Sequence, residues 1–269
     1  IFKVLDACKA DYVKWDMNRS VDNVFSAALP KERQGEVYHR YVLAVYEMME
    51  SLVQRYPDLL FESCSGGGGR FEAGMLYYSP QIWCSDNTDA IDRLKIQYGT
   101  SFGYPISTMG AHVSDCPNHT VGRETPFETR GHVALAGTFG YELDVTKIPE
   151  ENRKMIPEQT KMYHKYHELV REGDYYRIAS YRENHLYDCW AVAAKDKREV
   201  LVTYVHVLST PNAHSRRIFL QGFDTEAVYV LEGTEEKYTG EMLMKCGFLV
   251  KGFWGDFKSR LYHFVKVTE

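Results

Sequence analysis

Leu59-Leu-Phe-Glu-Ser-Cys-Ser-Gly-Gly-Gly-Gly-Arg70 is the segment from which the architecture of this 269-residue chain can be inferred. Residues 59–63 form a short apolar run that predicts a buried strand. The four glycines after it allow a close approach of the backbone to whatever lies at the end of that strand, because glycine has no Cβ. The preceding apolar residues recur at helical spacing until Pro57 ends the helix. A helix, a strand and a tight turn in this order indicate a parallel α/β fold.

The same alternation of strand-like and helix-like segments continues on both sides of this segment. The predicted strands cover residues 11–16, 59–63, 81–84, 107–114 and 141–145, and the predicted helices cover about 35–56, 89–98, 128–136 and 150–172. The first residues of the chain are predicted to be the edge of a strand. We therefore expect an α/β fold in which each parallel strand ends in polar residues.

After Gly173 the pattern changes to short strands that are separated by turn residues and charges. Such strands are predicted at residues 200–206, 216–220 and 227–231. This spacing is typical of an antiparallel β module. We place the boundary near residues 173–178, so that residues 1–175 form the α/β part and residues 176–269 the β part.

Composition limits the partners that this chain is expected to have. The net charge of −5 offers no electrostatic attraction to nucleic acid or to an anionic membrane. The six cysteines show neither a C-x-x-C pair nor the spacing of a zinc site, so reduced thiols are expected. The chain lacks a secretory signal and a run of membrane-spanning length, which favours a cytoplasmic location. Its first residue is not Met, and we expect it to be the interior of a longer protein.

Two aspartates stand in polar and aromatic clusters on either side of the glycines. Asp16 lies in Asp11-Tyr-Val-Lys-Trp-Asp-Met-Asn-Arg19, and Asp86 lies in Gln81-Ile-Trp-Cys-Ser-Asp-Asn-Thr-Asp89. Cleavage of a sugar acetal requires one carboxyl group to protonate the leaving oxygen and a second to meet the oxocarbenium-like carbon. Side chains at different strand ends can converge in this way. The pattern therefore predicts a glycosidase-type site.

The neighbours of each aspartate suggest different roles. Side chains alternate along a strand, so Lys14 and Asp16 share a face, and the ammonium would keep the carboxylate ionised as a nucleophile. An ordinary ion pair is the alternative, and these two residues alone favour it. Trp83 would desolvate Asp86 and keep it protonated as a general acid, although a solvated loop is equally consistent with this run. Asp89 is interpreted as a helix cap.

Other polar residues carry weaker signals. The glycine run lacks the Gly-Lys-Ser/Thr of a phosphate-binding loop, so a nucleotide site is not expected. His112 and Asp115 follow another strand and could border the pocket, although a buried structural histidine explains His112 equally well. His132 is expected to be structural, and the cluster Tyr163-His-Lys-Tyr-His167 is expected to form a solvated helix face.

With these motifs in place, the chain resembles the α-galactosidases of glycoside hydrolase family 36. The matching segments are Lys14-Trp-Asp-Met-Asn-Arg19, Cys64-Ser-Gly-Gly-Gly-Gly-Arg70, Trp83-Cys-Ser-Asp-Asn-Thr-Asp89, Arg93-Leu-Lys-Ile-Gln-Tyr-Gly99, Met109-Gly-Ala-His-Val-Ser114 and Glu128-Thr-Arg-Gly-His-Val-Ala134. The likeness is dense up to about residue 145 and looser across the β module. It implies an incomplete (β/α)8 TIM-type barrel, about strands 4 to 8, followed by an antiparallel β-sandwich domain.

The resemblance also implies an activity and its residues. The expected reaction is hydrolysis of terminal α-galactosides such as melibiose and raffinose-type sugars, with retention of configuration. Asp16 would be the nucleophile and Asp86 the acid/base, with carboxyl groups roughly 5 to 5.5 Å apart. Lys14, Asn18, Cys64, Gly67 and Trp83 match positions that line the galactose pocket. No metal and no organic cofactor are implied, and the full-length protein is expected to be a homotetramer.

The chain departs from this family at its start, because roughly the first three barrel strands have no counterpart in it. Five strands cannot close a barrel, so we expect this chain alone to be inactive. Two further interpretations remain open. One is an α-galactosyl transferase of the raffinose- or stachyose-synthase type, which would use the same two aspartates. The other is a non-catalytic sugar-binding fragment.

Overall fold

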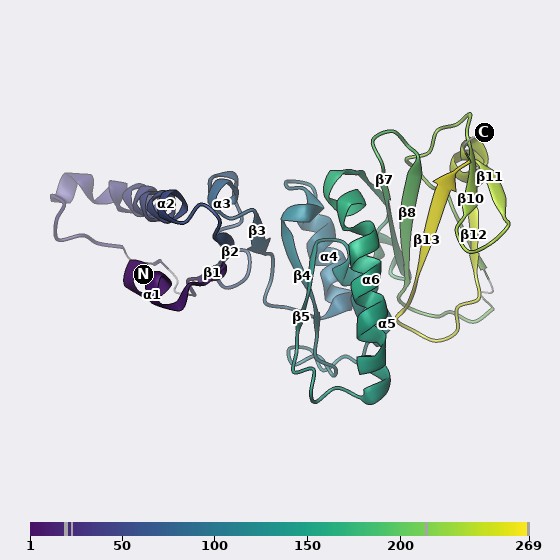
Figure 1. Ribbon diagram of the computed structural model, residues 1–269, viewed down its shortest axis with the longest axis horizontal. Coiled ribbons are helices and arrows are strands. Elements are labelled where there is room, and N and C mark those ends of the chain that lie inside the picture. The colour runs from purple at the N-terminus through teal and green to yellow at the C-terminus, as the bar shows by residue number, and fades with distance from the viewer. Residues whose placement is uncertain (19–20, 23, 213–214, 268–269) are drawn as a thin grey trace. The chain divides into compact units, whose positions relative to one another are not determined.

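The computed structural model describes residues 1–18, 21–22, 24–212 and 215–267 (Figure 1). Arg19, the last residue of the first aspartate motif, lies outside these ranges. The chain forms two compact units, Ile1–Asp86 and Asn87–Glu269. In the described part of the chain, no helix is both long and apolar enough to cross a membrane.

The first unit is built on three parallel strands with helices between them. Its elements are α1 (Phe2–Cys8), β1 (Tyr12–Asp16), η1 (Lys31–Glu36), α2 (Val37–Arg55), β2 (Leu60–Cys64), α3 (Ala73–Tyr78) and β3 (Gln81–Trp83). The strands lie in the order β1-β2-β3 and pair in parallel. Met49 and Leu52 of α2 pack with Phe61 of β2 and Ile82 of β3, which covers one face of these strands with a helix.

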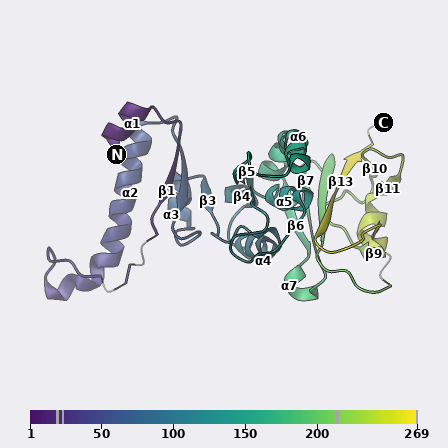
Figure 2. The ribbon, with the colours of Figure 1, turned by 90° about the horizontal axis from the view of Figure 1, so that it is seen from below.

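The second unit begins with a further α/β segment. It contains α4 (Ala90–Thr100), η2 (Ile106–Thr108), β4 (Met109–Ser114), α5 (Phe127–Ala134), β5 (Thr138–Glu142) and α6 (Glu150–Glu172). The strands β4 and β5 are parallel. Helix α6 runs beside α5 and also contacts β7, as both views show (Figures 1 and 2).

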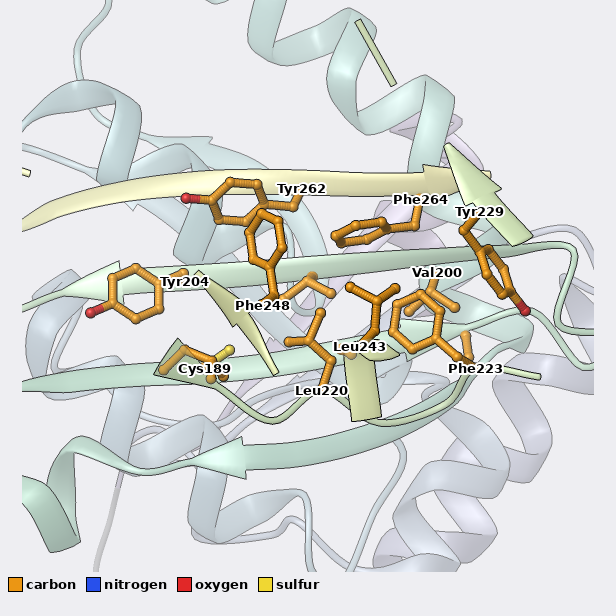
Figure 3. Packing of buried hydrophobic residues seen from close by; sticks show 14 of the residues in the cluster. Cys189, Val200, Tyr204, Leu220, Phe223, Tyr229, Leu243, Phe248, Tyr262 and Phe264 are labelled. Carbon is orange, nitrogen blue, oxygen red and sulfur yellow. The ribbon is translucent and has the colours of Figure 1, made fainter. Parts of the chain in front are cut away.

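The remainder of the second unit is antiparallel. It contains β6 (Asp174–Ala179), α7 (Tyr181–Asn184), β7 (Tyr187–Ala193), β8 (Glu199–His206), β9 (Ser215–Ile218), β10 (Val228–Leu231), β11 (Lys237–Thr239), η3 (Met242–Cys246), β12 (Phe248–Lys251) and β13 (Lys258–Lys266). Six strands form one sheet in the order β11-β10-β13-β8-β7-β6, and β9 pairs with β12. Aromatic rings fill the core of this part, where Phe248 lies between Tyr262 and Phe264 (Figure 3).

The observed elements confirm the predicted fold class, parallel α/β followed by antiparallel β. Two local predictions were wrong. Residues 2–8 form a helix and not a strand edge, since Leu5 packs into the core beside α2 and Lys9 ends the helix in a left-handed conformation. The strand predicted at 141–145 lies at Thr138–Glu142, because the Asp144 carboxylate accepts from the Thr146 amide and turns the chain there.

Candidate active site

The first aspartate lies at the carboxyl end of β1. Lys14 and Asp16 point to the more exposed face of this strand, while Val13 and Trp15 pack against the core of the first unit. This alternation confirms the predicted shared face of Lys14 and Asp16. The Asn18 side chain donates a hydrogen bond of 2.9 Å to the Asp16 carboxylate, whose side chain is exposed.

Cys64 lies opposite Asp16 at the end of the neighbouring strand. The parallel register pairs the two residues, and the Cys64 thiol interacts with the Asp16 carboxylate. Burial raises the pKa of the Cys64 thiol to about 11, and the negative charge of Asp16 acts in the same direction. The thiol is therefore neutral at physiological pH and can donate a proton to a hydrogen bond.

The glycine turn connects the ends of the strands. The Gly66 amide donates to Asn18 Oδ1 at 2.8 Å, and the Ser65 hydroxyl donates to the Met17 carbonyl at 2.7 Å. Gly67 has φ +78°, and a Cβ at this position would lie 2.8 Å from Ser85 Cα and 2.9 Å from the Asp86 amide nitrogen. One turn therefore contacts the segments that follow both aspartate-bearing strands.

Lys14 is held by two neighbours on the same face. Its Nζ lies 3.4 Å from Oε1 of Glu62 and 4.7 Å from the centroid of the Trp83 ring. Asp16 is the partner that the sequence pattern predicts for Lys14, whereas Glu62 was not predicted. Alternation along Leu60–Cys64 places Glu62 on the same face as Cys64, but only the parallel register pairs it with Lys14.

Asp86 is the last residue of the first unit and its side chain is exposed. The Trp83 ring is buried, at 2% exposure, and faces Lys14. The desolvation of Asp86 by Trp83 stays a prediction. Asp89 is confirmed as the cap of α4, since its carboxylate accepts from the Asp92 amide at 2.8 Å and also binds Arg123.

The other candidates lie in the second unit. His112 Nδ1 is 3.6 Å from Glu142 Oε2, and the Asp115 side chain is exposed. His132 hydrogen-bonds to the Ser259 hydroxyl, and burial lowers its pKa to about 4, which fits the structural role predicted for it. The segment 163–167 lies on α6, and the described residues contain no cluster of three His, Cys, Asp or Glu side chains that could hold a metal ion.

Parallel strands therefore present two exposed carboxylates at their carboxyl ends, together with the hydrogen-bond donors of Lys14, Asn18 and Cys64. Barrel enzymes carry their active sites at these ends, and paired carboxylates are the groups used by glycosidases. The fold and the site define the class of glycosidase-type α/β barrels. The chain belongs to glycosyl hydrolase family 36: residues 1–173 match the family Melibiase, and residues 187–264 match the Glycosyl hydrolase family 36 C-terminal domain.

Curated relatives show the same likeness. Alpha-galactosidase Mel36A of Lactobacillus acidophilus is 48% identical over 99% of this chain, which covers 36% of that protein. Alpha-galactosidase AgaA of Geobacillus stearothermophilus is 48% identical over 100% of this chain, which covers 37% of that protein. The chain thus spans little more than a third of these relatives.

Solved structures agree with this architecture. The crystal structure of AgaA from Geobacillus stearothermophilus superposes with a TM-score of 0.95 over 98% of this chain and 37% of its own, at 48% identity. The alpha-galactosidase from Lactobacillus brevis superposes with a TM-score of 0.96 over 100% of this chain and 37% of its own, at 40% identity. The fold is therefore part of a family 36 barrel followed by the C-terminal β domain.

Proposed function

We propose that the complete protein that contains this chain is a retaining α-galactosidase acting on terminal α-galactosides such as melibiose and raffinose-type sugars. One observation carries the proposal. The glycine turn that binds Asn18, the partner of Asp16, also packs directly against the backbone of Asp86. The two carboxylates thereby flank a single turn at the ends of parallel strands, and double displacement uses two carboxyl groups that flank the scissile bond.

In the proposed reaction Asp16 is the nucleophile and Asp86 the acid/base. The Asp16 carboxylate attacks the anomeric carbon while the glycosidic C–O bond breaks, and Asp86 gives its proton to the leaving oxygen. Asp86 then takes a proton from water as that water attacks the same carbon and releases Asp16. Two inversions give net retention of configuration.

The proposed pocket residues supply hydrogen bonds and shape. The Lys14 ammonium and the Cys64 thiol can donate to sugar hydroxyls, and the Asn18 amide orients the nucleophile through its 2.9 Å bond to Asp16. Trp83 places its ring beneath the Lys14 ammonium. Gly67 admits the close approach of the Asp86 backbone.

Structures of the Geobacillus stearothermophilus relative support the substrate class. Variants of AgaA are known in complex with raffinose, with stachyose and with 1-deoxygalactonojirimycin. The raffinose complex carries an Asp to Asn substitution, and the stachyose complex an Asp to Ala substitution. The two substituted aspartates stand as far apart in that sequence as Asp16 and Asp86 do here, which supports the assignment of these two residues.

We further infer that the catalytic barrel extends to about residue 175 and the β domain from residue 176 to 269. The two family matches, which end at residue 173 and begin at residue 187, support this boundary.

Trapping of the covalent intermediate tests the function and the roles together. A fluorinated galactosyl donor, incubated with the complete protein and followed by peptide mass mapping, is expected to label Asp16. Asp86→Ala should still be labelled by a donor with a good leaving group, because only protonation of the leaving oxygen is lost. Label on another carboxylate would overturn the roles, and a complete protein that neither hydrolyses nor binds α-galactosides would overturn the function.

A further inference from the structure

We propose that Glu62 is a positioning residue that fixes the Lys14 ammonium for the sugar; this inference rests on the function proposed above. Glu62 lies in the middle of β2 and is only 2% exposed. Burial of a carboxylate is costly unless its charge is paired and its oxygens accept hydrogen bonds. The groups that compensate for the burial of Glu62 therefore indicate what it does.

One carboxylate oxygen is held by the two flanking strands. Oε2 of Glu62 accepts from the Tyr12 hydroxyl of β1 and from Nε2 of Gln81, at 3.2 Å, on β3. Burial, together with the hydrogen bond and the negative charge of Glu62, raises the pKa of Tyr12 far above its ordinary value, so the phenol keeps its proton. Because both donors bind the same oxygen, the carboxylate cannot rotate without breaking both bonds.

The other oxygen is directed to Lys14. Oε1 of Glu62 lies 3.4 Å from Lys14 Nζ and accepts no hydrogen bond from any residue that the structure describes. The Trp83 ring lies on a second side of the same ammonium. The ion pair and the ring contact hold the ammonium in place, and its N–H donors can still bind a ligand hydroxyl. The Lys14 side chain is 35% exposed and can reach a ligand.

This arrangement reduces the freedom of a side chain that is otherwise flexible. An unrestrained lysine loses rotamer entropy when it is fixed by a ligand. Displacement of a binding group by about 1 Å can lower activity by about 100-fold. Loss of the Glu62 charge should therefore weaken sugar binding through Lys14, although Glu62 itself does not touch the sugar.

A double-mutant cycle in the complete protein tests this coupling. The variants are Glu62→Gln, Lys14→Met and the two together, and the measurements are the Kd of 1-deoxygalactonojirimycin by calorimetry and kcat and KM on nitrophenyl α-galactoside. We expect Glu62→Gln to weaken binding about 10- to 100-fold in the wild-type background and by less than about 2-fold in the Lys14→Met background. Equal losses in both backgrounds would show a general structural role and overturn the inference.

Glu72→Gln is the matched control, because Glu72 in the same unit also accepts from a tyrosine, Tyr46, at 2.8 Å, but pairs with no lysine in the part of the chain that the structure describes. It should change the Kd by less than about 2-fold. The rate of Lys14 acetylation by acetic anhydride, read by mass spectrometry, gives a second measurement that needs no activity. It should rise in Glu62→Gln and stay low in Glu62→Asp, which keeps the charge. An unchanged rate in Glu62→Gln would contradict the inference.

The two proposals fail in different ways. A wild-type complete protein that binds no galactose analogue would overturn the proposed function and this inference with it. An active wild type whose Glu62→Gln variant loses affinity independently of Lys14 would overturn the positioning role alone.

Discussion

Gly66 and Gly67 share a left-handed backbone conformation, with φ of +52° and +78°, but differ in their surroundings. A Cβ on Gly66 would have no neighbour within 4 Å among the described residues, whereas one on Gly67 would meet the backbone of Ser85 and Asp86 at 2.8 and 2.9 Å. Any L-residue pays the same kind of conformational cost at both positions, about 1 kcal/mol. The difference between the two therefore reports the contact with the loop of Asp86.

We accordingly expect Gly67→Ala to lower kcat/KM by about 100-fold, since a displacement of about 1 Å at a reacting group has this effect. Gly66→Ala should lower it by less than about 10-fold, through conformational strain alone. Steady-state kinetics on nitrophenyl α-galactoside in the complete protein, with circular dichroism to check folding, make the comparison. Equal losses in the two variants would refute a specific role for the contact between Gly67 and Asp86.

The buried carboxyl group of Asp188 makes the stability of the folded chain depend on pH. This side chain on β7 is buried and accepts from the Tyr181 amide at 2.9 Å, and burial raises its pKa from 3.8 to about 7. The folded state thus holds a proton that the unfolded state releases above about pH 4. The contribution of Asp188 to the free energy of unfolding is complete below pH 4 and is lost as the pH rises towards 7.

Asp188→Asn should remove this dependence while it keeps an oxygen that can accept from Tyr181. Relative to the variant, the wild type should lose about 2 to 4 kcal/mol between pH 4 and pH 7, at about 1.4 kcal/mol per pKa unit. Urea unfolding followed by tryptophan fluorescence at each pH measures the difference. Asp144→Asn is the control. Hydrogen bonds from Thr146 and Lys147 lower the pKa of this exposed carboxyl group to about 2, so the pH dependence that it adds to stability is confined to values below about pH 4. A pH-independent difference between wild type and Asp188→Asn would contradict the burial argument.

Residue identities predicted some contacts and missed others. The alternation of Lys14 and Asp16 and the capping role of Asp89 follow from local geometry, and the structure confirms both. The pairing of Lys14 with Glu62 depends on the register between two strands, which no local pattern specifies. Asp86 is exposed, which agrees with the solvated loop that the sequence left open for this run.

The stabilisation of helix α4 by its cap residue Asp89 can be distinguished from the general effect of an acidic residue near the start of a helix. Asp89 is 2% exposed, accepts from the Asp92 amide and binds Arg123. Asp89→Ala should lower the free energy of unfolding by about 2 to 4 kcal/mol. The substitution removes the helix cap and takes away one of the carboxylates that balance the charge of Arg123. Glu150→Ala, in the first turn of α6, should cost less than about 0.5 kcal/mol, because its pair with Lys154 is exposed. Urea unfolding measures the free energy lost in each variant. Similar losses would show that Asp89 stabilises the chain no more than any acidic residue near the start of a helix.

Elements were predicted well where the chain carries its own start and stop signals. Helix α6 has the predicted bounds 150–172, and the structure places Pro149 and Gly173 directly before and after it. The short helices α1 and α3 were missed, since their formation depends on packing of Leu5 and Met75 into the core of the first unit. Tertiary contacts of this kind are invisible in a local pattern.

At the scale of the whole molecule, the described residues supply five parallel strands, and a (β/α)8 barrel needs eight. Strand β1 pairs only with β2 among the described residues, which leaves its other edge without a hydrogen-bonded strand. Paired strands in a closed barrel hold each strand end in a fixed position, whereas an open edge can fray or pair with other chains. The nucleophile proposed here lies at the end of that edge strand.

We therefore expect this 269-residue chain alone to show no turnover of nitrophenyl α-galactoside. Co-expression with the part of AgaA from Geobacillus stearothermophilus that this chain does not cover should restore activity, since that relative is 48% identical over the length of this chain. The same mixture with Asp16→Asn is the control and should remain inactive, because the supplied part would complete the barrel without replacing the nucleophile. Clear turnover by the unaccompanied chain would show that the open edge of β1 does not disturb the site, and the argument from barrel closure would fail.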